Sequence, residues 1–359
     1  MKSRAVTLAP AKINLYLRLG SVRLDGYHNL DTVMQTIALA DWIALEHYQD
    51  PDVPASHRLL FETDGCRVAM SVALPDLDPA SAQAAAAAIC DPGRGTVPRA
   101  VRAWLQAGRR QQGCLPWAGG TLLISLEKRI PVEAGLGGAS TDAAAALRLL
   151  QALFPDAALA GNTLLRLAAA IGADVPFCLT GGLARCRGIG EQIHSLPPLP
   201  NLAVDLVKPR LGISTARAFA HYRAAGPGWE ERRSGPDAAA RETFLTALAD
   251  LSHARYRAVL READLVSCLA RLRAAGGNDF ESLLAVDAPW MADWLAWLRS
   301  RPSNSYTGLS GSGSTVFTLR PDGGAPLDAA AWFREHRPDE HPQLFTTRLL
   351  DRLPAILFD

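Results

Sequence analysis

Apolar and polar residues alternate along the opening segment, residues 6–19. Over its second half, one side carries only aliphatic residues and the other carries polar or amphipathic ones. The two sides are Ile13, Leu15, Leu17 and Leu19 against Asn14, Tyr16 and Arg18. A period of two is typical of a β-strand with one buried face, which we expect here. Asp25 and Gly26 end this strand, and a second apolar stretch follows at residues 33–45.

Residues 49–117 carry a much weaker pattern. They are rich in Ala, Pro, Gly and Asp, include an alanine run at 84–88, and show a clear period only at 100–105. Alanine favours helix, so part of this segment is predicted to be helical. The rest is predicted to be a long, mobile excursion from the compact body, without a role in the chemistry.

The remaining elements alternate between strands and helices without a strict βαβ rhythm, which predicts an α+β fold. The expected strands are 121–126, 203–207, 315–319 and 345–350, the expected helices are 142–154 and 164–171, and helical patterns recur up to residue 299. Pro155 and Gly172 end the two helices. The linker-like P-P-L-P at 197–200 suggests two domains, which we divide as 1–185 and 186–359.

The charge balance narrows the class of partner. The 359 residues include 37 basic and 36 acidic side chains, a net charge of +1, so a nucleic acid or a membrane surface is not expected as the main partner. No apolar stretch approaches the roughly 18 residues that span a bilayer, and the first residues lack a signal-peptide pattern. The six cysteines are scattered without a C-x-x-C pair, which is typical of reduced packing residues. We therefore expect a cytoplasmic protein, monomeric or homodimeric, that acts on a small molecule.

A glycine-rich loop is the strongest chemical signal. Residues 130–142 read I-P-V-E-A-G-L-G-G-A-S-T-D and lie between an expected strand and an expected helix. Glycine permits positive φ and close approach of backbone amides to an anion, and a helix N-terminus attracts phosphate. Ser140 and Thr141 add hydroxyls. The loop matches neither G-x-x-x-x-G-K-[ST] nor G-x-G-x-x-G. The alternative is a tight turn capped by Ser140, but the loop's length favours a phosphate site.

Two charged residues stand in unusual settings. Lys12 lies among small and apolar residues, where a buried lysine needs an anionic partner; otherwise it is an exposed edge lysine. Asp174 follows a helix-ending glycine and is either a turn or cap residue or a general base. A carboxylate near a lysine stays ionised and can accept a proton from a hydroxyl.

A second small-residue loop, G-L-S-G-S-G-S-T, occupies residues 308–315 and runs into an expected strand. It is either a flexible turn or a closure of the phosphate site, for which Gly311, Ser312 and Gly313 are the candidates. It does not match the hydrolase motif G-x-S-x-G.

Three motifs occur in one order: P-A-K-I-N at 10–14, P-V-E-A-G-L-G-G-A-S-T-D at 131–142 and L-S-G-S-G at 309–313. This order resembles the GHMP kinases, named for galactokinase, homoserine, mevalonate and phosphomevalonate kinases. Shorter pieces also fit: D-G-Y-H-N-L at 25–30, K-R-I-P at 128–131, G-A-D-V-P-F at 172–177, G-I-G-E at 188–191, I-S-T-A-R-A-F at 213–219 and N-D-F-E at 278–281. The resemblance implies an N-terminal domain like ribosomal protein S5 domain 2 and a ferredoxin-like C-terminal domain.

The resemblance also implies a reaction: transfer of phosphate from ATP, with Mg²⁺, to the 2-hydroxyl of a cytidine diphosphate-linked methylerythritol in the non-mevalonate route to isoprenoid precursors. It makes Asp174 the catalytic base and Lys12 its charged companion. It places the nucleotide on Lys128, Pro131, Gly135, Leu136, Gly137, Gly138, Ala139, Ser140 and Thr141. It places the substrate on Asn14, Tyr27, His28, Ile189 and Phe219. The Mg²⁺ ligands are not identified.

Three features depart from the family pattern. Ala139 stands where a third loop glycine is common, G-T-V-P at 95–98 replaces an Asn-Leu pair whose Asn contacts adenine, and residues 49–117 and 222–255 lengthen the chain. Two rival hypotheses remain. A homoserine-type or mevalonate-type kinase would not need the aromatic residues Tyr27 and Phe219. A catalytically inactive binding protein of the same fold would be expected to lack Lys12 or Asp174.

Overall fold

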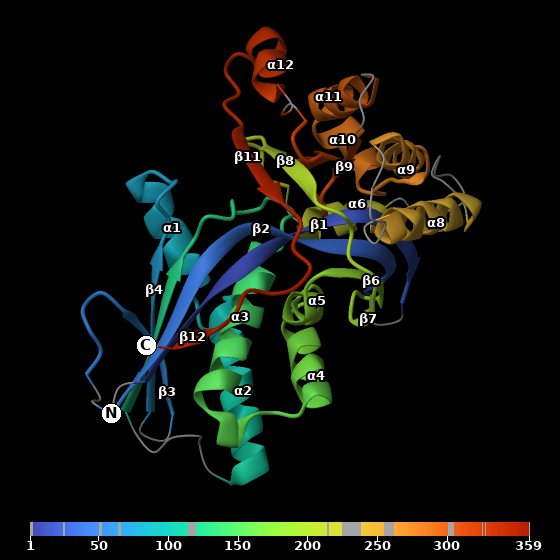
Figure 1. Ribbon diagram of the computed structural model, residues 1–359. Helices are drawn as coiled ribbons and strands as arrows, with labels where there is room; N and C mark the ends of the chain where they lie inside the picture. Colours follow the sequence, from blue (N-terminus) through green and yellow to red (C-terminus); the bar gives the residue numbers. More distant parts are fainter. Residues whose placement is uncertain are drawn as a thin grey trace.

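Two β-sheets and their flanking helices make up the chain (Figure 1). The computed structural model describes residues 3–23, 26–49, 52–63, 66–113, 120–213, 215–224, 238–254, 262–300, 305–324, 326 and 328–358. Asp25, which we expected to help end the first strand, and Ser214 of the I-S-T-A-R-A-F piece lie outside these residues. No helix in the part of the chain described is long and apolar enough to cross a membrane.

The first sheet is built on two long antiparallel strands, β1 (Ser3–Val22) and β2 (His28–Tyr48). Its order is β12-β1-β2-β5-β4-β3, with β6 also paired to β2 and β7 to β6. The other strands are β3 (Arg58–Thr63), β4 (Cys66–Ala73), β5 (Gly120–Glu127), β6 (Leu183–Gly188), β7 (Gln192–Ser195) and β12 (Leu357–Phe358). Because β12 pairs with the beginning of β1, the C-terminal segment returns to the first sheet (Figure 1).

The first strand is confirmed, but its predicted single buried face is wrong. Asn14, Tyr16 and Arg18 are buried as fully as their aliphatic neighbours. The second half of the chain covers this face, and Tyr16 packs against Phe244 with ring centroids 5.1 Å apart. The sequence pattern cannot distinguish a polar residue that another layer of the fold covers from one that faces solvent.

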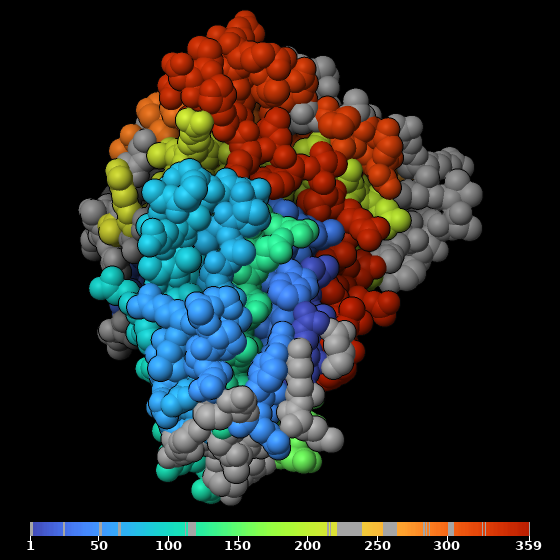
Figure 2. Space-filling view, turned by 90° about the vertical axis from the view of Figure 1, so that its left-hand side faces the viewer, coloured from blue at the N-terminus to red at the C-terminus, as the bar shows by residue number. Residues whose placement is uncertain are grey.

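The prediction for residues 49–117 as a mobile excursion is wrong. They form β3, β4, α1 (Pro79–Ile89) and α2 (Thr96–Gln112), and β4 pairs in parallel with β5. Val101 and Trp104 of α2 are buried in the core. Figure 2 shows β3, β4 and α1, in light blue and cyan, forming one continuous surface below the red C-terminal segment. Weak local periodicity concealed these elements, because α1 buries no residue and β4 finds its partner far along the chain.

Helices α2, α3 (Gly138–Leu153), α4 (Gly161–Ile171) and α5 (Val175–Thr180) lie together below the first sheet in Figure 1. A 3-10 turn at Pro155–Ala157 follows α3, as the predicted helix end at Pro155 requires. The predicted helices at 142–154 and 164–171 are thus confirmed, although α3 begins four residues earlier. The apolar face of α3 is rich in alanine, which allows the helix to lie close to β1.

The second sheet has the order β11-β8-β10-β9 and is antiparallel throughout. Its strands are β8 (Leu202–Lys208), β9 (Tyr306–Leu309), β10 (Val316–Pro321) and β11 (Gln343–Arg348). The helices of this half are α6 (Thr215–Ala224), α8 (Ala238–Ala254), α9 (Glu262–Ala275), α10 (Glu281–Asp287), α11 (Pro289–Ser300) and α12 (Ala329–His336). The strands predicted at 203–207, 315–319 and 345–350 and the mixed α/β architecture are confirmed.

The division at residue 185/186 stays a prediction. Strand β6 runs across it, and β7 also pairs with the first sheet. The proline-rich segment at 197–200 has no secondary structure and leads directly into β8 of the second sheet.

Candidate active site

A cavity of about 940 Å³ lies where the two halves meet. Its walls come from β1, from the glycine-rich loop before α3, from the turn before α5, from α6 and from the loop between β9 and β10. Segments that are distant in the sequence therefore contribute to one site.

The first glycine loop presents a helix N-terminus without a side-chain cap. Gly137 occupies the N-cap position of α3 with φ 73°, and no side chain there accepts from the helix amides. The alternative of a turn capped by Ser140 is therefore wrong. Ser140 is half-buried and lines the cavity, whereas Thr141 is buried and its hydroxyl donates to the carbonyl oxygen of Pro10 at 2.8 Å. The amide-rich start of α3 suits an anion.

The second glycine loop packs directly on the first. The Ser310 hydroxyl donates to the Gly135 carbonyl oxygen at 3.0 Å, and the Thr315 amide donates to the Ala134 carbonyl oxygen at 3.2 Å. Gly135 has φ 74°, and a Cβ there would overlap the carbonyl oxygen of Ser310, so only glycine fits. Gly311 and Ser312 line the cavity. Gly313 lies behind them, beside Leu309 and Ile213.

Lys12 and Asp174 meet in the cavity wall. The Lys12 Nζ lies 3.3 Å from Asp174 Oδ2 and donates to Asn14 Oδ1 at 2.6 Å and to the Gly135 carbonyl oxygen at 3.1 Å. Lys12 is buried, so the alternative of an exposed edge lysine is wrong. Asp174 stands at the N-cap position of α5 but makes no capping hydrogen bond, and its side chain is 33% exposed. It lines the cavity, where it can accept a proton.

Asn14 is oriented by a short hydrogen-bond chain. Its Nδ2 donates to Thr32 Oγ1 at 2.9 Å, and the Thr32 hydroxyl donates to the Tyr16 carbonyl oxygen at 2.6 Å. The amide oxygen of Asn14 is thereby held toward Lys12. Sequence reasoning missed Thr32, because its contact arises from the register of β1 with β2.

Lys128 is held by two acids beneath the first loop. Its Nζ lies 2.7 Å from Asp142 Oδ2 and also contacts Asp41, and all three residues are buried. Asp41 Oδ1 accepts from the amides of Arg129 at 2.6 Å and Ile130 at 2.8 Å. Lys128 lines the cavity, as its predicted nucleotide contact requires, but much of its charge is neutralised within the protein. Asp41 was missed, although an acid at the centre of an apolar stretch is itself a signal.

The two acids share one cation, and burial shifts the pKa of Asp142. Burial raises the pKa of Asp142 to about 8, Lys128 opposes the rise and Asp41 reinforces it. Burial by itself would lower the pKa of Lys128, but Asp142 and Asp41 outweigh it and raise the pKa. Asp142 is accordingly neutral through much of the acid and neutral range, which reduces negative charge beneath a loop suited to phosphate.

The far end of the cavity is aromatic. The His28 and Phe219 rings lie 5.5 Å apart between centroids, and Phe280 contacts Phe219 edge-on at 5.1 Å. His28 is buried; its Nδ1 lies 3.3 Å from the Gly20 carbonyl oxygen, and its Nε2 has no partner among the described residues. Tyr27 is 59% exposed at the rim, and Ile189 lines the wall beside Asp174. Phe280 belongs to the N-D-F-E piece at 278–281, but it was not assigned a role in the site from the sequence.

This fold and this cavity define a small-molecule kinase of the GHMP class: an uncapped glycine loop faces a carboxylate–ammonium pair and a polar-aromatic recess. The GHMP kinases N terminal domain matches residues 99–182. The chain is 34% identical to the 4-diphosphocytidyl-2-C-methyl-D-erythritol kinase of Moorella thermoacetica over 95% of this chain and 98% of that protein. It is also 34% identical to the kinase of the same name from Granulibacter bethesdensis, over 90% of this chain and 88% of that one. The chain belongs to the 4-diphosphocytidyl-2-C-methyl-D-erythritol kinase family.

Solved structures agree with this assignment. A crystal structure of 4-(cytidine 5'-diphospho)-2C-methyl-D-erythritol kinase matches 95% of this chain and 98% of its own, with a TM-score of 0.59 and 28% identity. A homoserine kinase from Cytophaga hutchinsonii matches 99% of this chain and 97% of its own with a TM-score of 0.61, but at 14% identity it shows the fold alone.

Replacing Lys128 with Met should destabilise the protein by roughly 3–5 kcal/mol, because the buried acids Asp41 and Asp142 lose their shared cation. Urea denaturation monitored by circular dichroism measures the loss. Arg129→Met is the control: its ion pair with Glu127 has side chains 61% and 38% exposed, so a loss of at most about 1 kcal/mol is expected. Equal losses in the two variants would contradict the buried-triad assignment.

Asp142→Asn should change how stability depends on pH. The folded pKa of Asp142 is about 8, above the ordinary carboxyl value, so between these values the native state binds more protons than the unfolded state. Its contribution to the free energy of unfolding therefore falls as pH rises, by up to about 1.4 kcal/mol per pH unit. Denaturation at pH 5, 6.5 and 8 should show Asp142→Asn gaining stability relative to the parent protein. A pH-independent difference would rule out the raised pKa.

Proposed function

We propose that this protein transfers the γ-phosphate of ATP to the 2-hydroxyl of 4-diphosphocytidyl-2-C-methyl-D-erythritol, a step of the non-mevalonate route to isoprenoid precursors. The observation that carries the proposal is the 3.3 Å contact of Lys12 Nζ with Asp174 Oδ2 in a cavity that also holds the glycine loop and the aromatic recess. The relatives named above act as kinases on the same alcohol.

The chemistry at the reacting hydroxyl follows from this pair. Asp174 is the partly exposed member of this pair, and its carboxylate accepts the hydroxyl proton as the oxygen forms its bond to the γ-phosphorus. The bond from that phosphorus to the bridging oxygen breaks, which yields ADP and a phosphate monoester. Lys12 orients the hydroxyl and offsets charge on the transferring group. Because the transition state is loose, positioning and charge neutralisation contribute most of the rate.

The nucleotide phosphates fit the first glycine loop, where the uncapped amides of α3 and the helix dipole favour an anion. Gly311 and Ser312 would close the site from the second loop. Adenosine would lie toward Lys128 and Pro131. Thr141 would support the loop from below through its bond to Pro10 rather than by direct contact with a phosphate.

The residues of the cavity fit a Mg²⁺ ion that is bound mainly by the phosphates of the nucleotide. Among the described residues, no cluster of three or more His, Cys, Asp or Glu could hold a metal alone, and Mg²⁺ commonly takes its ligands from phosphates, waters and one or two protein oxygens. The Ser140 hydroxyl, which lines the cavity at the start of α3, would hold it together with the phosphates. When bound, Mg²⁺ neutralises charge on the phosphate oxygens.

The aromatic recess supports a cytidyl substrate over a small aliphatic alcohol. The buried, unpartnered Nε2 of His28 offers one hydrogen bond to a base edge. Tyr27 and Phe219 would stack on the cytosine, Ile189 would contact it from the wall, and Asn14 would face the methylerythritol end. Homoserine or mevalonate would leave this recess unfilled. A two-domain division, S5 domain 2-like and ferredoxin-like, and a cytoplasmic location complete the proposal.

Asp174→Asn should lower turnover by at least about 10²-fold, because the amide cannot accept the proton. Lys12→Met should lower turnover by a similar factor, because it removes the positive charge and the group that orients the hydroxyl. Arg320→Met is the matched control: Arg320 is also a buried cation, but it pairs with Asp205 at 2.8 Å between β8 and β10 and does not line the cavity. Coupled-enzyme assays of ADP release, at equal folded fractions by circular dichroism, measure the effect. Near-parental turnover of Asp174→Asn would refute the base assignment.

The function itself is tested by assaying the purified protein with Mg-ATP and three alcohols in parallel. The cytidyl substrate should be phosphorylated with kcat/KM at least about 10³-fold above that for homoserine or mevalonate, because only it fills the recess. Preference for homoserine or mevalonate would identify the other kinase type. Binding of Mg-ATP without turnover of any of them would favour an inactive binding protein.

A further inference from the structure

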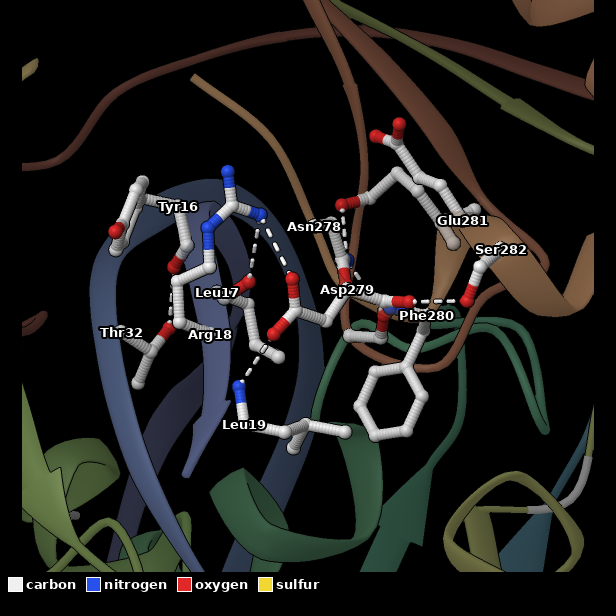
Figure 3. A network of polar contacts seen from close by, with 12 residues as sticks. Tyr16, Leu17, Arg18, Leu19, Thr32, Asn278, Asp279, Phe280, Glu281 and Ser282 are labelled. Carbon is white, nitrogen blue, oxygen red and sulfur yellow. Dashed lines mark hydrogen bonds and ion pairs between the residues drawn. The ribbon is translucent and has the colours of Figure 1, made fainter. Parts of the chain in front are cut away.

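The segment 277–282, which runs from the loop after α9 into the first turn of α10, lies against β1 beside the cavity. The Leu17 amide donates to the Gly277 carbonyl oxygen at 3.0 Å, and the Asp279 amide donates to the Leu17 carbonyl oxygen at 3.0 Å. Leu17 and Asn278 thus form a parallel bridge. Figure 3 shows this segment facing the Tyr16–Leu19 part of β1. A short loop of the second half is therefore hydrogen-bonded to β1 of the first sheet.

The same segment supports two walls of the cavity. Asn278 Nδ2 donates to the carbonyl oxygens of Leu309 at 2.8 Å and Gly311 at 2.7 Å, which holds the second glycine loop. Asn278 Oδ1 accepts from the Phe280 amide at 2.9 Å, and Phe280 lines the aromatic recess against Phe219. A shift of this segment would move both walls.

One buried ion pair fixes the segment in place. Arg18 Nη1 donates to Asp279 Oδ1 at 3.0 Å, and Asp279 Oδ2 accepts from the Leu19 amide at 2.7 Å (Figure 3). The side chains of Arg18 and Asp279 are only 8% and 6% exposed. A Cβ on Gly277 would lie 2.8 Å from Arg18 Nη2, so the guanidinium is closely seated between the segment and Tyr16, whose ring it faces at 4.9 Å.

This pair is a poor source of stability. Arg18 Nε and Nη2 are buried without a partner among the described residues. Desolvation of two charges commonly cancels their attraction, and an apolar pair of similar volume is often as stable. What such a pair does provide is a defined geometry, because each charge has one acceptable position.

We propose that Arg18 and Asp279 are positioning residues for the substrate end of the cavity. They hold segment 277–282 so that Phe280 backs Phe219 and His28, and they do not touch the reactants. This inference rests on the proposed function for its kinetic readout alone. Its structural readout is independent of any substrate.

Asp279→Asn and Arg18→Met should each raise the KM for the cytidyl substrate by about fivefold or more, because the recess loses its fixed wall. The KM for Mg-ATP should rise less than the KM for the cytidyl substrate, because the first loop also contacts Lys12, which does not depend on segment 277–282. The double variant Arg18→Met/Asp279→Asn removes both charges and should be more stable than either single variant. It should nevertheless keep the raised KM.

Asp205→Asn is the matched control. Asp205 pairs with Arg320 at 2.8 Å between β8 and β10, with side chains 6% and 10% exposed, and neither residue lines the cavity. Its burial equals that of the Arg18–Asp279 pair, so it should cost comparable stability but leave both KM values within about twofold.

Hydrogen–deuterium exchange tests the positioning without turnover. Exchange over residues 277–282 and 308–313 should accelerate in Asp279→Asn and Arg18→Met and stay at the parental rate in Asp205→Asn. Unchanged exchange, or recovery of the substrate KM in the double variant, would overturn the inference. If exchange accelerates in the two variants but the parent protein fails to phosphorylate the cytidyl substrate, the proposed function is refuted and the positioning role stays supported.

Discussion

The buried ammonium of Lys12 is the constraint on which the cavity depends. A charge in this position is tolerated only if oxygen atoms surround it, and the structure supplies Asn14 Oδ1, the Gly135 carbonyl oxygen and Asp174 Oδ2. These three oxygens come from β1, from the first glycine loop and from the turn before α5. Satisfying one lysine therefore draws three separate segments into the arrangement that the reaction needs.

The same physical rule operates at two further buried cations. Lys128 ties β2 to α3 through Asp41 and Asp142, and Arg18 ties β1 to the segment before α10 through Asp279. Each cation fixes one side of the cavity, and each would be costly without its partner. In the proposed function, the polyanion would bind mainly to uncharged groups, the amides at the start of α3. This arrangement would hold phosphate without an exposed cluster of lysines, which agrees with a chain of almost zero net charge.

Several parts of the site were predictable because their signal is local. A glycine with positive φ, such as Gly135, and an uncapped helix start both produce a short, recognisable sequence pattern. A lysine among small residues likewise indicates a buried charge. The partners of those charges were not predictable. Asp41 and Asp279 lie 87 and 261 residues from Lys128 and Arg18, and the sequence carries no sign of either pairing. Phe280 likewise lines the cavity only because its amide donates to Asn278 Oδ1, which fixes the backbone at this point.

By itself the sequence determined the mixed α/β character, most strands and helices outside residues 49–117, and the two glycine loops with Lys12 and Asp174, since these depend on backbone preferences and on charge type. Only the tertiary structure decided that β1 is buried on both faces, that residues 49–117 complete the first sheet, and that one lysine is shared by two acids. The reason is that burial and ion pairing are set by what lies across a sheet or beneath a loop. Those neighbours are chosen by packing among distant segments, which no local pattern encodes.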